Sequence, residues 1–393
     1  MGIIKSLIDT DLYKFSMMYV AFKKYPTKDV AYRFVCRNKE VNLLPYKEEI
    51  KQEISELCNL NFKSEEIEFL RKQNLYSEDF LSFLRSFKLK ENLISITEKN
   101  GNLSIEAEGS WVDTILFEVF VLSIVNEVYF RNTQPNASRE IGLKKLQEKI
   151  DLVKELNDYS NKKGYPLFKF IDFGTRRRFS SVWQGEIDLI LAKELPENFI
   201  GTSSVYWAMK TGIKPVGTMA HEYLQFFQAV AKDLKHFQRE ALEVWQEVFG
   251  GKLAVALSDV ISTKAFLEDL NLELTKSYTG LRQDSGNPLL WADQVLAHYK
   301  KMGVDPKTKS LVFSDGLDFP KAKLIYLYTV ETTNPLFGIG TNITNNFDFK
   351  PLNIVMKMVK ADGKPVAKIS DEPSKAICDS PEFLALLKDT FKV

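Results

Sequence analysis

The sequence predicts an α/β protein in which a β/α barrel is joined to a second, β-containing α+β domain. Three patterns indicate this. Short apolar runs alternate with amphipathic helices from residue 165 onward, strand and helix patterns are mixed before that point, and a hairpin pattern follows the last run. A chain of 393 residues is also long for a single hydrophobic core. We therefore expect an N-terminal domain at residues 1–135, completed by residues 350–393, and the barrel at residues 136–349.

The N-terminal part of the chain carries signals of both strands and helices. Asn100-Gly101 is a strong hairpin turn, and the residues of Leu93–Glu108 around it read as two short strands. A further strand is expected at Val30–Cys36, and helices are expected at 47–87, Trp111–Asn132 and Ser138–Asn157.

Apolar runs that would form the barrel strands recur after residue 165. The clearest helix between two of them is Pro288–Met302, which has proline at its first position and Gly303 just beyond its end. About seven β-α units in roughly 180 residues imply parallel strands with right-handed crossovers, and favour a barrel over an open sheet. The runs are Leu167–Gly174, Asn198–Gly201, Pro215–Thr218, Leu253–Asp259, Tyr278–Arg282, Ser310–Gly316 and Leu336–Gly340.

A last hairpin is expected near the C-terminus. Asp362-Gly363 separates Leu352–Val359 from Pro365–Ile369, and this dipeptide is typical of a tight turn between strands. We expect this hairpin to pack against the N-terminal domain.

Charge and composition exclude several classes of protein. The chain has 53 Lys and Arg against 52 Asp and Glu, so bulk charge does not favour a nucleic-acid surface. Its three cysteines lack the spacing of a metal pair or a disulfide framework. The N-terminus lacks the apolar core of a secretory signal, and the uncharged stretch Val119–Asn126 is too short to cross a bilayer. We expect a cytoplasmic protein without nucleic-acid or membrane partners.

Small and polar residues gather where each apolar run ends. In a β/α barrel the carboxyl ends of the strands form one rim, and active sites lie there. We therefore expect these separate segments to converge on one mouth. They are Asp172–Arg176, Gly201–Ser204, Gly217–Glu222, Ser258-Asp259, Gly280–Gly286, Ser314–Gly316 and Gly338–Thr341.

Each cluster also has an ordinary structural interpretation. Gly338–Thr341 could let backbone N–H groups approach a phosphate, or could be a simple strand-to-helix turn. Arginines 176–178 could bind an anion or begin a helix, although cations at a helix N-terminus oppose its dipole. The remaining alternatives are a structural ion pair for Arg282 with Asp284, and helix capping for Asp259 and Asp315.

The three histidines differ in their surroundings. His236 shares a helix face with glutamates and is expected in solvent, while His298 lies late in a helix expected outside the barrel, in packing or solvent. His221 follows a strand end and begins a helix beside Glu222, so it is the histidine best placed for chemistry. It could be a general base or a nucleophile, and the helix N-terminus would favour an added phosphoryl charge.

Eight stretches of the chain carry a further signal. They are IDTDLYKFSMM (8–18), ILFEVFVLSIVNEVYFR (115–131), DFGTRRRFS (172–180), GTSSVYWAMKTGIKPVGTMAHE (201–222), GLRQDSGNP (280–288), LVFSDGLD (311–318), FGIGT (337–341) and PLNIVMKMVKADGKPVAKISDEPSK (351–375). Together, and in order over essentially the whole chain, they resemble nicotinate phosphoribosyltransferase, of the type II phosphoribosyltransferase family. The resemblance implies an irregular α/β barrel beside a β-containing domain built from both chain ends.

The same resemblance implies an ATP-dependent enzyme of NAD biosynthesis. Such enzymes join nicotinate to 5-phosphoribosyl 1-diphosphate, giving nicotinate mononucleotide and diphosphate. ATP is the co-substrate and is hydrolysed through a transient phosphohistidine, and Mg²⁺ accompanies the diphosphate. The phosphorylated histidine of the family matches His221, and Asp259 and Asp284 would lie near the ribose and Mg²⁺. Phe173 would stack on the pyridine ring, with Tyr13 from the second subunit of a homodimer opposite it.

Further substrate-binding residues are implied by the resemblance. Arg176 and Arg282 would face nicotinate or the phosphates, and Lys357, Lys368 and Lys375 would approach phosphates. Two strand-end segments would hold the ribose 5-phosphate; their residues are Ser314, Asp315 and Gly316, and Gly338, Gly340 and Thr341. Thr202 and Ser203 are the remaining substrate-binding residues.

One position separates related enzymes. Enzymes for nicotinamide resemble this scaffold but have Asp where this chain has Ser203, and an Asp would repel the carboxylate of nicotinate. A serine can donate a hydrogen bond to that carboxylate, so Ser203 favours nicotinate. Ser204 and Asn287 replace residues that are often Asn and Asp in relatives, and Asn287 retains capping chemistry.

Two other classes of protein remain as alternatives. A Schiff-base lyase on a phosphate-binding barrel would need an inward lysine at a strand end, and the strand ends offer none. A non-catalytic relative would be expected to have lost His221, Asp284 or the turn GIGT, and all three are present.

Overall fold

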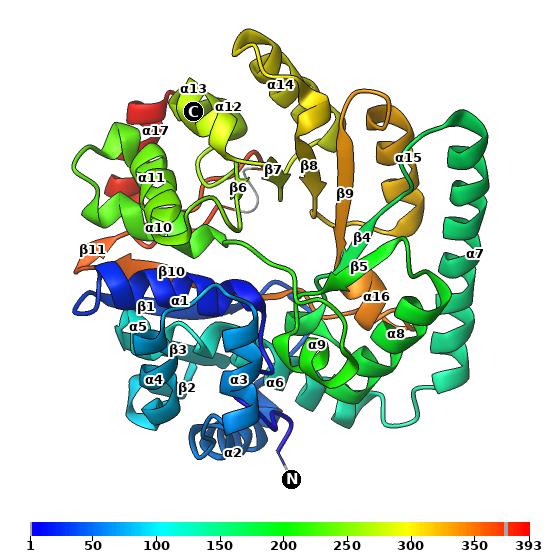
Figure 1. Ribbon diagram of the computed structural model, residues 1–393. Helices are drawn as coiled ribbons and strands as arrows, with labels where there is room; N and C mark the ends of the chain where they lie inside the picture. The colour runs from blue at the N-terminus through cyan, green and yellow to red at the C-terminus, as the bar shows by residue number, and fades with distance from the viewer. Residues whose placement is uncertain (1, 373–375) are drawn as a thin grey trace. The chain divides into compact units, whose positions relative to one another are not determined.

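The computed structural model describes residues 2–372 and 376–393. The chain divides into two compact units, each assembled from segments that are distant in sequence (Figure 1). Unit 1 comprises Met1–Asp151, Ile171–Gly217 and Ile339–Lys357, and unit 2 comprises Leu152–Phe170, Thr218–Gly338 and Met358–Val393.

An antiparallel sheet has the strand order β11-β10-β1-β3-β2. The strands β2 (Ile94–Lys99) and β3 (Asn102–Ser110) form the predicted Asn100-Gly101 hairpin, and both turn residues have positive φ. The strands β10 (Ile354–Ala361) and β11 (Lys364–Pro365) form the predicted C-terminal hairpin. In the strand order, β10 stands next to β1 (Asp29–Cys36).

Helices surround the N-terminal strands of unit 1. In Figure 1, α2 (Lys47–Cys58), α3 (Ser64–Lys72) and α4 (Glu78–Ser86) lie near β2 and β3. The helix predicted over 111–132 is divided into α5 (Trp111–Thr114) and α6 (Phe117–Thr133). Most of α6 is buried, as its nearly continuous apolar sequence requires.

A parallel sheet has the strand order β5-β4-β9-β8-β7-β6. Three of its strands start level with one another, because Val255 pairs with Gly280 and Gly280 pairs with Ser310. Gly280 is required there, since a Cβ would lie 2.4 Å from the Ser310 carbonyl oxygen. The strands are β4 (Phe170–Asp172), β5 (Phe199–Thr202), β6 (Val255–Leu257), β7 (Gly280–Gln283), β8 (Ser310–Phe313) and β9 (Asn334–Ile339). The predicted fold class, alternating strands and helices beside a β-containing second part, is confirmed.

The prediction of a strand at Pro215–Thr218 is wrong. This segment contributes one parallel bridge, between Pro215 and Thr202, and no extended ladder. Proline has no N–H to donate to a sheet, so an apolar run that begins with it is a weak strand.

The remaining helices connect these strands. Asn287 caps α14 (Pro288–Lys301), as predicted, by accepting from the N–H groups of Leu289 and Leu290. Along the chain these helices are α1 (Leu12–Lys24), η1 (Leu44–Tyr46), η2 (Glu91–Leu93), α7 (Arg139–Lys163), η3 (Thr175–Arg177), α8 (Ser181–Glu194), α9 (Val205–Thr211), α10 (His221–Val230), η4 (Leu234–His236), α11 (Phe237–Phe249), α12 (Thr263–Asp269), α13 (Leu272–Ser277), α14 (Pro288–Lys301), η5 (Pro306–Thr308), α15 (Phe319–Thr329), α16 (Thr341–Thr344) and α17 (Pro381–Phe391).

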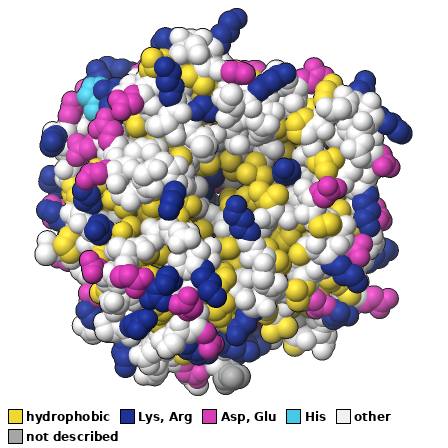
Figure 2. Space-filling model, viewed as in Figure 1, with side chains coloured by type: hydrophobic (Ala, Val, Ile, Leu, Met, Phe, Trp, Pro, Cys, Tyr) yellow, Lys and Arg dark blue, Asp and Glu magenta, His cyan; other side chains and the backbone are white. Residues whose placement is uncertain are grey.

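The surface agrees with the balanced composition. Lys and Arg side chains are interspersed with Asp and Glu over the face drawn in Figure 2. In the part of the chain that the structure describes, no helix is both long and apolar enough to cross a membrane.

Candidate active site

The predicted site residues fall into two groups, one in each unit. Lys375 lies outside the described residues. Unit 1 contains Tyr13, Phe173, Arg176, Thr202, Ser203, Gly340, Thr341 and Lys357. Unit 2 contains His221, Asp259, Arg282, Asp284, Ser314, Asp315, Gly316, Gly338 and Lys368.

In unit 2, two carboxylates lie beside one imidazole. His221 begins α10 and is 3% exposed. Its Nε2 lies 3.0 Å from Asp259 Oδ1, and its Nδ1 lies 3.7 Å from Asp284 Oδ2. Asp259 and Asp284 follow the neighbouring parallel strands β6 and β7, which explains why side chains distant in sequence reach the same ring.

Asp259 is fully buried and accepts from several groups. Ser285 Oγ donates to its Oδ2 at 2.5 Å, and Lys368 Nζ lies 3.3 Å from the same oxygen. Burial alone would raise the pKa of Asp259, but Lys368, His221 and Ser285 hold it well below the usual range. Asp259 is therefore ionised and can only accept hydrogen bonds.

The capping alternative for these strand-end aspartates is wrong. The N-cap of α12 is Ser262, whose side chain accepts from Ala265 N–H. The N-cap of α15 is Asp318, whose side chain accepts from Lys321 N–H. Neither Asp259 nor Asp315 caps the helix that follows it, and the carboxylate of Asp259 instead contacts His221.

The His221 imidazole is neutral near neutral pH. Burial and the nearby Lys368 ammonium lower its pKa to about 4, although Asp259 and Asp284 oppose this shift. Because ionised Asp259 accepts, Nε2 carries the ring proton and donates it to Asp259. The Nδ1 atom then holds the lone pair, which makes it the nucleophilic nitrogen of the ring.

Asp284 is held by hydroxyl and cationic neighbours. Ser314 Oγ lies 2.9 Å from Asp284 Oδ1, and the side chain of Asp284 remains 26% exposed. Burial raises its pKa, but Arg282, His221 and Lys368 outweigh this and lower it. Arg282 donates from Nη1 to Met219 O at 3.1 Å, and its Nε is buried without a partner among the described residues.

In unit 1, the hydroxyls of Thr202 and Ser203 donate to carboxylates of the chain itself. Thr202 Oγ1 donates to Asp172 Oδ2 at 3.0 Å, and Ser203 Oγ donates to Asp11 Oδ1 at 2.7 Å. Burial raises the pKa of Asp11 despite the charge of Arg176 and the bond from Ser203. Asp11 and Asp172 were not predicted as site residues, since their contacts to Thr202 and Ser203 depend on the fold.

The three consecutive arginines have three different partners. Arg178 is fully buried and forms a two-pronged ion pair with Asp9, at 2.6 and 2.8 Å. Arg177 donates from Nε to a backbone carbonyl at the start of β10 at 3.0 Å. Arg176 is 38% exposed, with its Nη1 3.4 Å from Glu118 Oε1. Of the three arginines, the part-exposed Arg176 is therefore the best candidate for binding an anion.

The turn that contains Gly340 requires glycine for a close backbone approach. A Cβ on Gly340 would lie 2.9 Å from the Phe173 carbonyl oxygen, and one on Gly174 would lie 2.1 Å from Thr344 Oγ1. The predicted stacking residue Phe173 is thus held by backbone packing against this turn.

A metal site made by the chain alone is absent from the described residues. No group of three or more His, Cys, Asp and Glu side chains in residues 2–372 and 376–393 could hold a metal ion. The oxygens of Asp259 already accept from three groups, so this carboxylate has little capacity for a cation. The carboxylate of Asp284 is part exposed and therefore has more capacity for a cation than that of Asp259.

The other two histidines have structural partners. His236 is part exposed, and its Nδ1 lies 2.7 Å from Asp269 Oδ1. His298 is buried, and its Nε2 lies 3.1 Å from Thr275 Oγ1. His298 is therefore packed in the interior, which was one of the two alternatives predicted for it.

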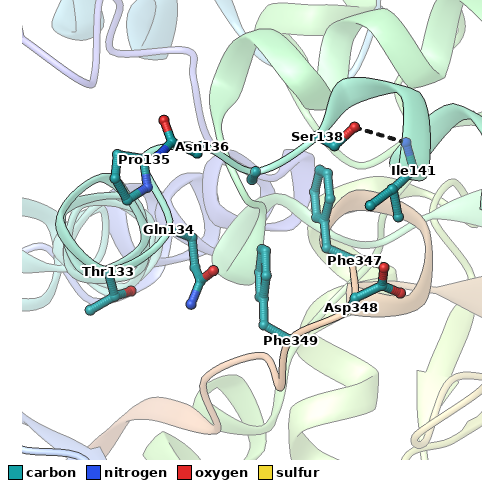
Figure 3. Close-up of a pocket in the computed structure, with 10 residues that line it drawn as sticks. Thr133, Gln134, Pro135, Asn136, Ser138, Ile141, Phe347, Asp348 and Phe349 are labelled. Carbon is teal, nitrogen blue, oxygen red and sulfur yellow. Dashed lines mark hydrogen bonds between the residues drawn. The ribbon is translucent and has the colours of Figure 1, made fainter.

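A pocket of about 320 Å³ in unit 1 lies outside the predicted site residues (Figure 3). Phe347 and Phe349 line it with rings 5.2 Å apart and nearly parallel, facing the segment 133–138. Ser138 accepts from Ile141 N–H at its rim, which caps the start of α7. None of its lining residues belongs to the groups above.

Known proteins are similar to this chain over its full length. The family model described as "Nicotinate phosphoribosyltransferase (NAPRTase) family" matches residues 168–393, and the model of the family's N-terminal domain matches residues 8–126. A nicotinate phosphoribosyltransferase of Bordetella pertussis is 47% identical over 393 residues, covering 100% of this chain and 96% of the relative. One of Burkholderia ambifaria is 46% identical over 394 residues, covering 100% and 97%.

Solved structures are similar over the whole chain. The nicotinate phosphoribosyltransferase of Vibrio cholerae has a TM-score of 0.95 at 38% identity, covering 100% of this chain and 94% of that one. That of Porphyromonas gingivalis has a TM-score of 0.93 at 30% identity, covering 100% of both chains. The chain belongs to the nicotinate phosphoribosyltransferase family.

Proposed function

We propose that this protein transfers the 5-phosphoribosyl group of 5-phosphoribosyl 1-diphosphate to nicotinate, and that ATP hydrolysis through His221 accompanies the transfer. The products would be nicotinate mononucleotide, diphosphate, ADP and phosphate, in the salvage route to NAD. The observation that carries the ATP-coupled part is the neutral, buried imidazole of His221 with Nε2 donating to Asp259. We further propose a cytoplasmic homodimer in which Tyr13 serves the partner's site.

The phosphoryl step follows from the ring's two nitrogens. His221 Nδ1 would attack the γ-phosphorus of ATP, forming an N–P bond as the bond to the ADP oxygen breaks. The ring keeps its Nε2 proton, so it becomes a cation, and the carboxylate of Asp259 at 3.0 Å stabilises that charge. Water would later cleave the N–P bond, releasing phosphate and returning the neutral imidazole.

Two further groups assist this step. Lys368, 5% exposed and 3.3 Å from Asp259, places a positive charge where phosphate oxygens would gather. Its ammonium also helps to keep His221 unprotonated, and only the unprotonated ring has the lone pair needed for attack. Asp284, near Nδ1, would be turned toward the ribose or Mg²⁺ rather than toward an incoming phosphate oxygen.

The glycosyl transfer itself needs no protein nucleophile. The pyridine nitrogen of nicotinate would form a bond to ribose C1 while the bond from C1 to diphosphate breaks. Positive charge develops on the ribose and negative charge on the leaving group, and preorganised charges stabilise both. Arg176, Lys357 and Arg282 are proposed to hold the carboxylate and phosphates, and the turn at Gly340-Thr341 the ribose 5-phosphate.

The residues present fit Mg²⁺ bound through the substrate rather than in a protein cage. Asp284 would supply one oxygen, with diphosphate oxygens and water completing the shell. When bound, Mg²⁺ neutralises part of the leaving-group charge.

The direct test is product formation. Purified protein supplied with nicotinate, 5-phosphoribosyl 1-diphosphate, ATP and Mg²⁺ should form nicotinate mononucleotide, detected by liquid chromatography. Parallel reactions with nicotinamide or quinolinate should give far less product. Folded protein that yields no nicotinate mononucleotide would exclude the proposed function.

The coupling to ATP has a separate test. The variant His221→Asn should lose nicotinate-stimulated ATP hydrolysis yet keep some ATP-independent transfer. Persistence of labelled phosphate from ATP on this variant would show that another residue is the phosphoryl acceptor.

A further inference from the structure

Helix α6 carries buried polar residues that its apolar sequence does not explain. Glu118, Ser123 and Asn126 are at most 4% exposed, and Glu127 follows directly in the same helix. Burying such groups is costly unless each is paired, so their partners should identify their role.

Three of these residues hold the backbone of the arginine loop. Ser123 Oγ donates to Thr175 O at 2.9 Å, and Asn126 Nδ2 donates to Arg178 O at 2.6 Å. Glu127 Oε2 accepts from Ser181 N–H at 3.1 Å. Spacings of three and four residues place them on one face of α6, and the loop backbone is therefore fixed from Thr175 to Ser181.

Glu118 is different, because its carboxylate contacts side chains. Its Oε2 lies 2.8 Å from Lys14 Nζ, and its Oε1 lies 3.4 Å from Arg176 Nη1. The side chains of Lys14 and Glu118 are 0% and 5% exposed. Burial would raise the pKa of Glu118, but Lys14, Arg176 and Lys357 together lower it to about 2. Glu118 is therefore charged and bridges a buried cation and a part-exposed one.

Several charged groups act on this cluster. Lys14, Arg176 and Lys357 lower the pKa of Glu118, and Asp11 lies close enough for its charge to interact with those of Arg176 and Glu118. A buried lysine and glutamate beside a substrate-facing arginine are also expensive to desolvate, and apolar side chains would fill the same space without that cost. The pair is better explained by what it does to Arg176.

We propose that Glu118 is a positioning residue for Arg176, with Lys14 as its buried counter-ion, and that this triad sets the affinity for the carboxylate of nicotinate. Lys14 offsets the charge of Glu118, so that Glu118 orients the guanidinium of Arg176 without adding a net negative charge beside an anionic ring substituent. The inference rests on the proposed function, because it assigns Arg176 to nicotinate.

Two variants separate positioning from simple charge. Glu118→Gln removes one negative charge, so the net charge of the cluster becomes more positive by one. If Glu118 only offsets charge, this variant should bind nicotinate more tightly. If Glu118 positions Arg176, the dissociation constant and KM for nicotinate should rise roughly tenfold, since a hydrogen bond to a charged group is lost, with kcat changed less.

The double variant Lys14→Met/Glu118→Gln removes one positive and one negative charge, so the net charge of the cluster stays the same. Positioning predicts that its KM for nicotinate stays raised, whereas charge balance alone predicts a return to the value of the unaltered protein. It leaves no unpaired buried charge, so it tests the inference even if Glu118→Gln does not fold. The control is Glu49→Gln, which removes from α2 a part-exposed carboxylate that pairs with Arg131. This control should leave the KM for nicotinate unchanged.

Nicotinate binding by calorimetry, steady-state kinetics and labelling of His221 by ATP are measured on each folded variant. We expect weaker nicotinate binding with unchanged labelling. Unchanged or tighter nicotinate binding by both Glu118 variants, with the unaltered protein active, overturns this inference alone. If the unaltered protein makes no nicotinate mononucleotide, the proposed function fails, and calorimetry still decides the role of Glu118. Absence of nicotinate binding by the unaltered protein overturns both.

Discussion

The variant Asp259→Asn should nearly abolish phosphorylation of His221. Asp259 is 0% exposed and accepts from His221 Nε2 at 3.0 Å, from Ser285 at 2.5 Å, and pairs with Lys368 at 3.3 Å. An asparagine offers one accepting oxygen and an NH₂ group, so at least one donor loses its partner. If the NH₂ faces His221, the ring proton moves to Nδ1 and the attacking lone pair is lost.

The magnitude follows from these contacts. Losing a hydrogen bond to a charged group costs about 1.5–3 kcal/mol, which is roughly 10- to 100-fold in rate. Imposing the wrong tautomer by replacing an orienting Asp costs up to about 10⁴-fold in a serine protease triad. We therefore expect labelling of His221 to slow on the order of 10³-fold. Lys368 would also become a buried cation without its carboxylate, lowering stability by roughly 3–5 kcal/mol.

The assay is single-turnover transfer of labelled γ-phosphate from ATP to protein. Thermal melting identifies the temperature at which the variant is folded. Asp269→Asn is the matched control, since it disrupts the other His–Asp pair, with His236 at 2.7 Å, and should label normally. Labelling of folded Asp259→Asn within about threefold of the unaltered protein would refute the orienting role of Asp259.

Three other predictions use the same contacts. Since the pKa of His221 is lowered to about 4, labelling should stay constant from pH 8 to about pH 5, and a half-loss near 6.5 would contradict this. Burial and neighbouring carboxylates raise the pKa of Asp172 to about 6 and that of Asp188 well above its usual range. The stability that the protonated pair contributes is therefore lost as pH rises through about 6. Asp188→Asn should consequently raise Tm more at pH 8 than at pH 5. An equal change in Tm at both pH values would contradict this prediction. Gly340→Ala should raise the KM for nicotinate severalfold, because its Cβ would meet Phe173 O at 2.9 Å, and an unaltered KM would show that the turn yields without moving Phe173.

Local signals predicted much of the fold. The Asn100-Gly101 and Asp362-Gly363 turns placed both hairpins, and six of the seven apolar runs became strands of the parallel sheet. The strand predicted at Pro215 was wrong because the prediction rested on apolar character alone, whereas proline has no N–H to donate to a sheet.

The sequence names candidate site residues but does not give their contacts. His221 stands out because it follows a strand end and begins a helix, but its partners depend on which strands are neighbours. Local rules left Asp259 as a capping candidate, and the structure shows that Ser262, three residues later, takes that role. Ser203 was expected to donate to the carboxylate of nicotinate. In the structure its hydroxyl donates to Asp11, which is 192 residues away and could not be inferred from sequence.

The polar residues of α6 are a local signal in the sequence. Ser123, Asn126 and Glu127 interrupt an apolar helix at spacings of three and four, a pattern that indicates a buried polar contact. What they contact, the backbone of the arginine loop, required the fold.

The measurement that tests the central claim most directly is the identity of the phosphorylated atom. Protein incubated with ATP and Mg²⁺, denatured in alkali and examined by ³¹P NMR and mass spectrometry, should carry one phosphoryl group on His221, at Nδ1. A phosphoryl group on Nε2 would contradict the hydrogen bond assigned to Asp259, and the absence of any phosphohistidine from an active protein would contradict the proposed coupling to ATP.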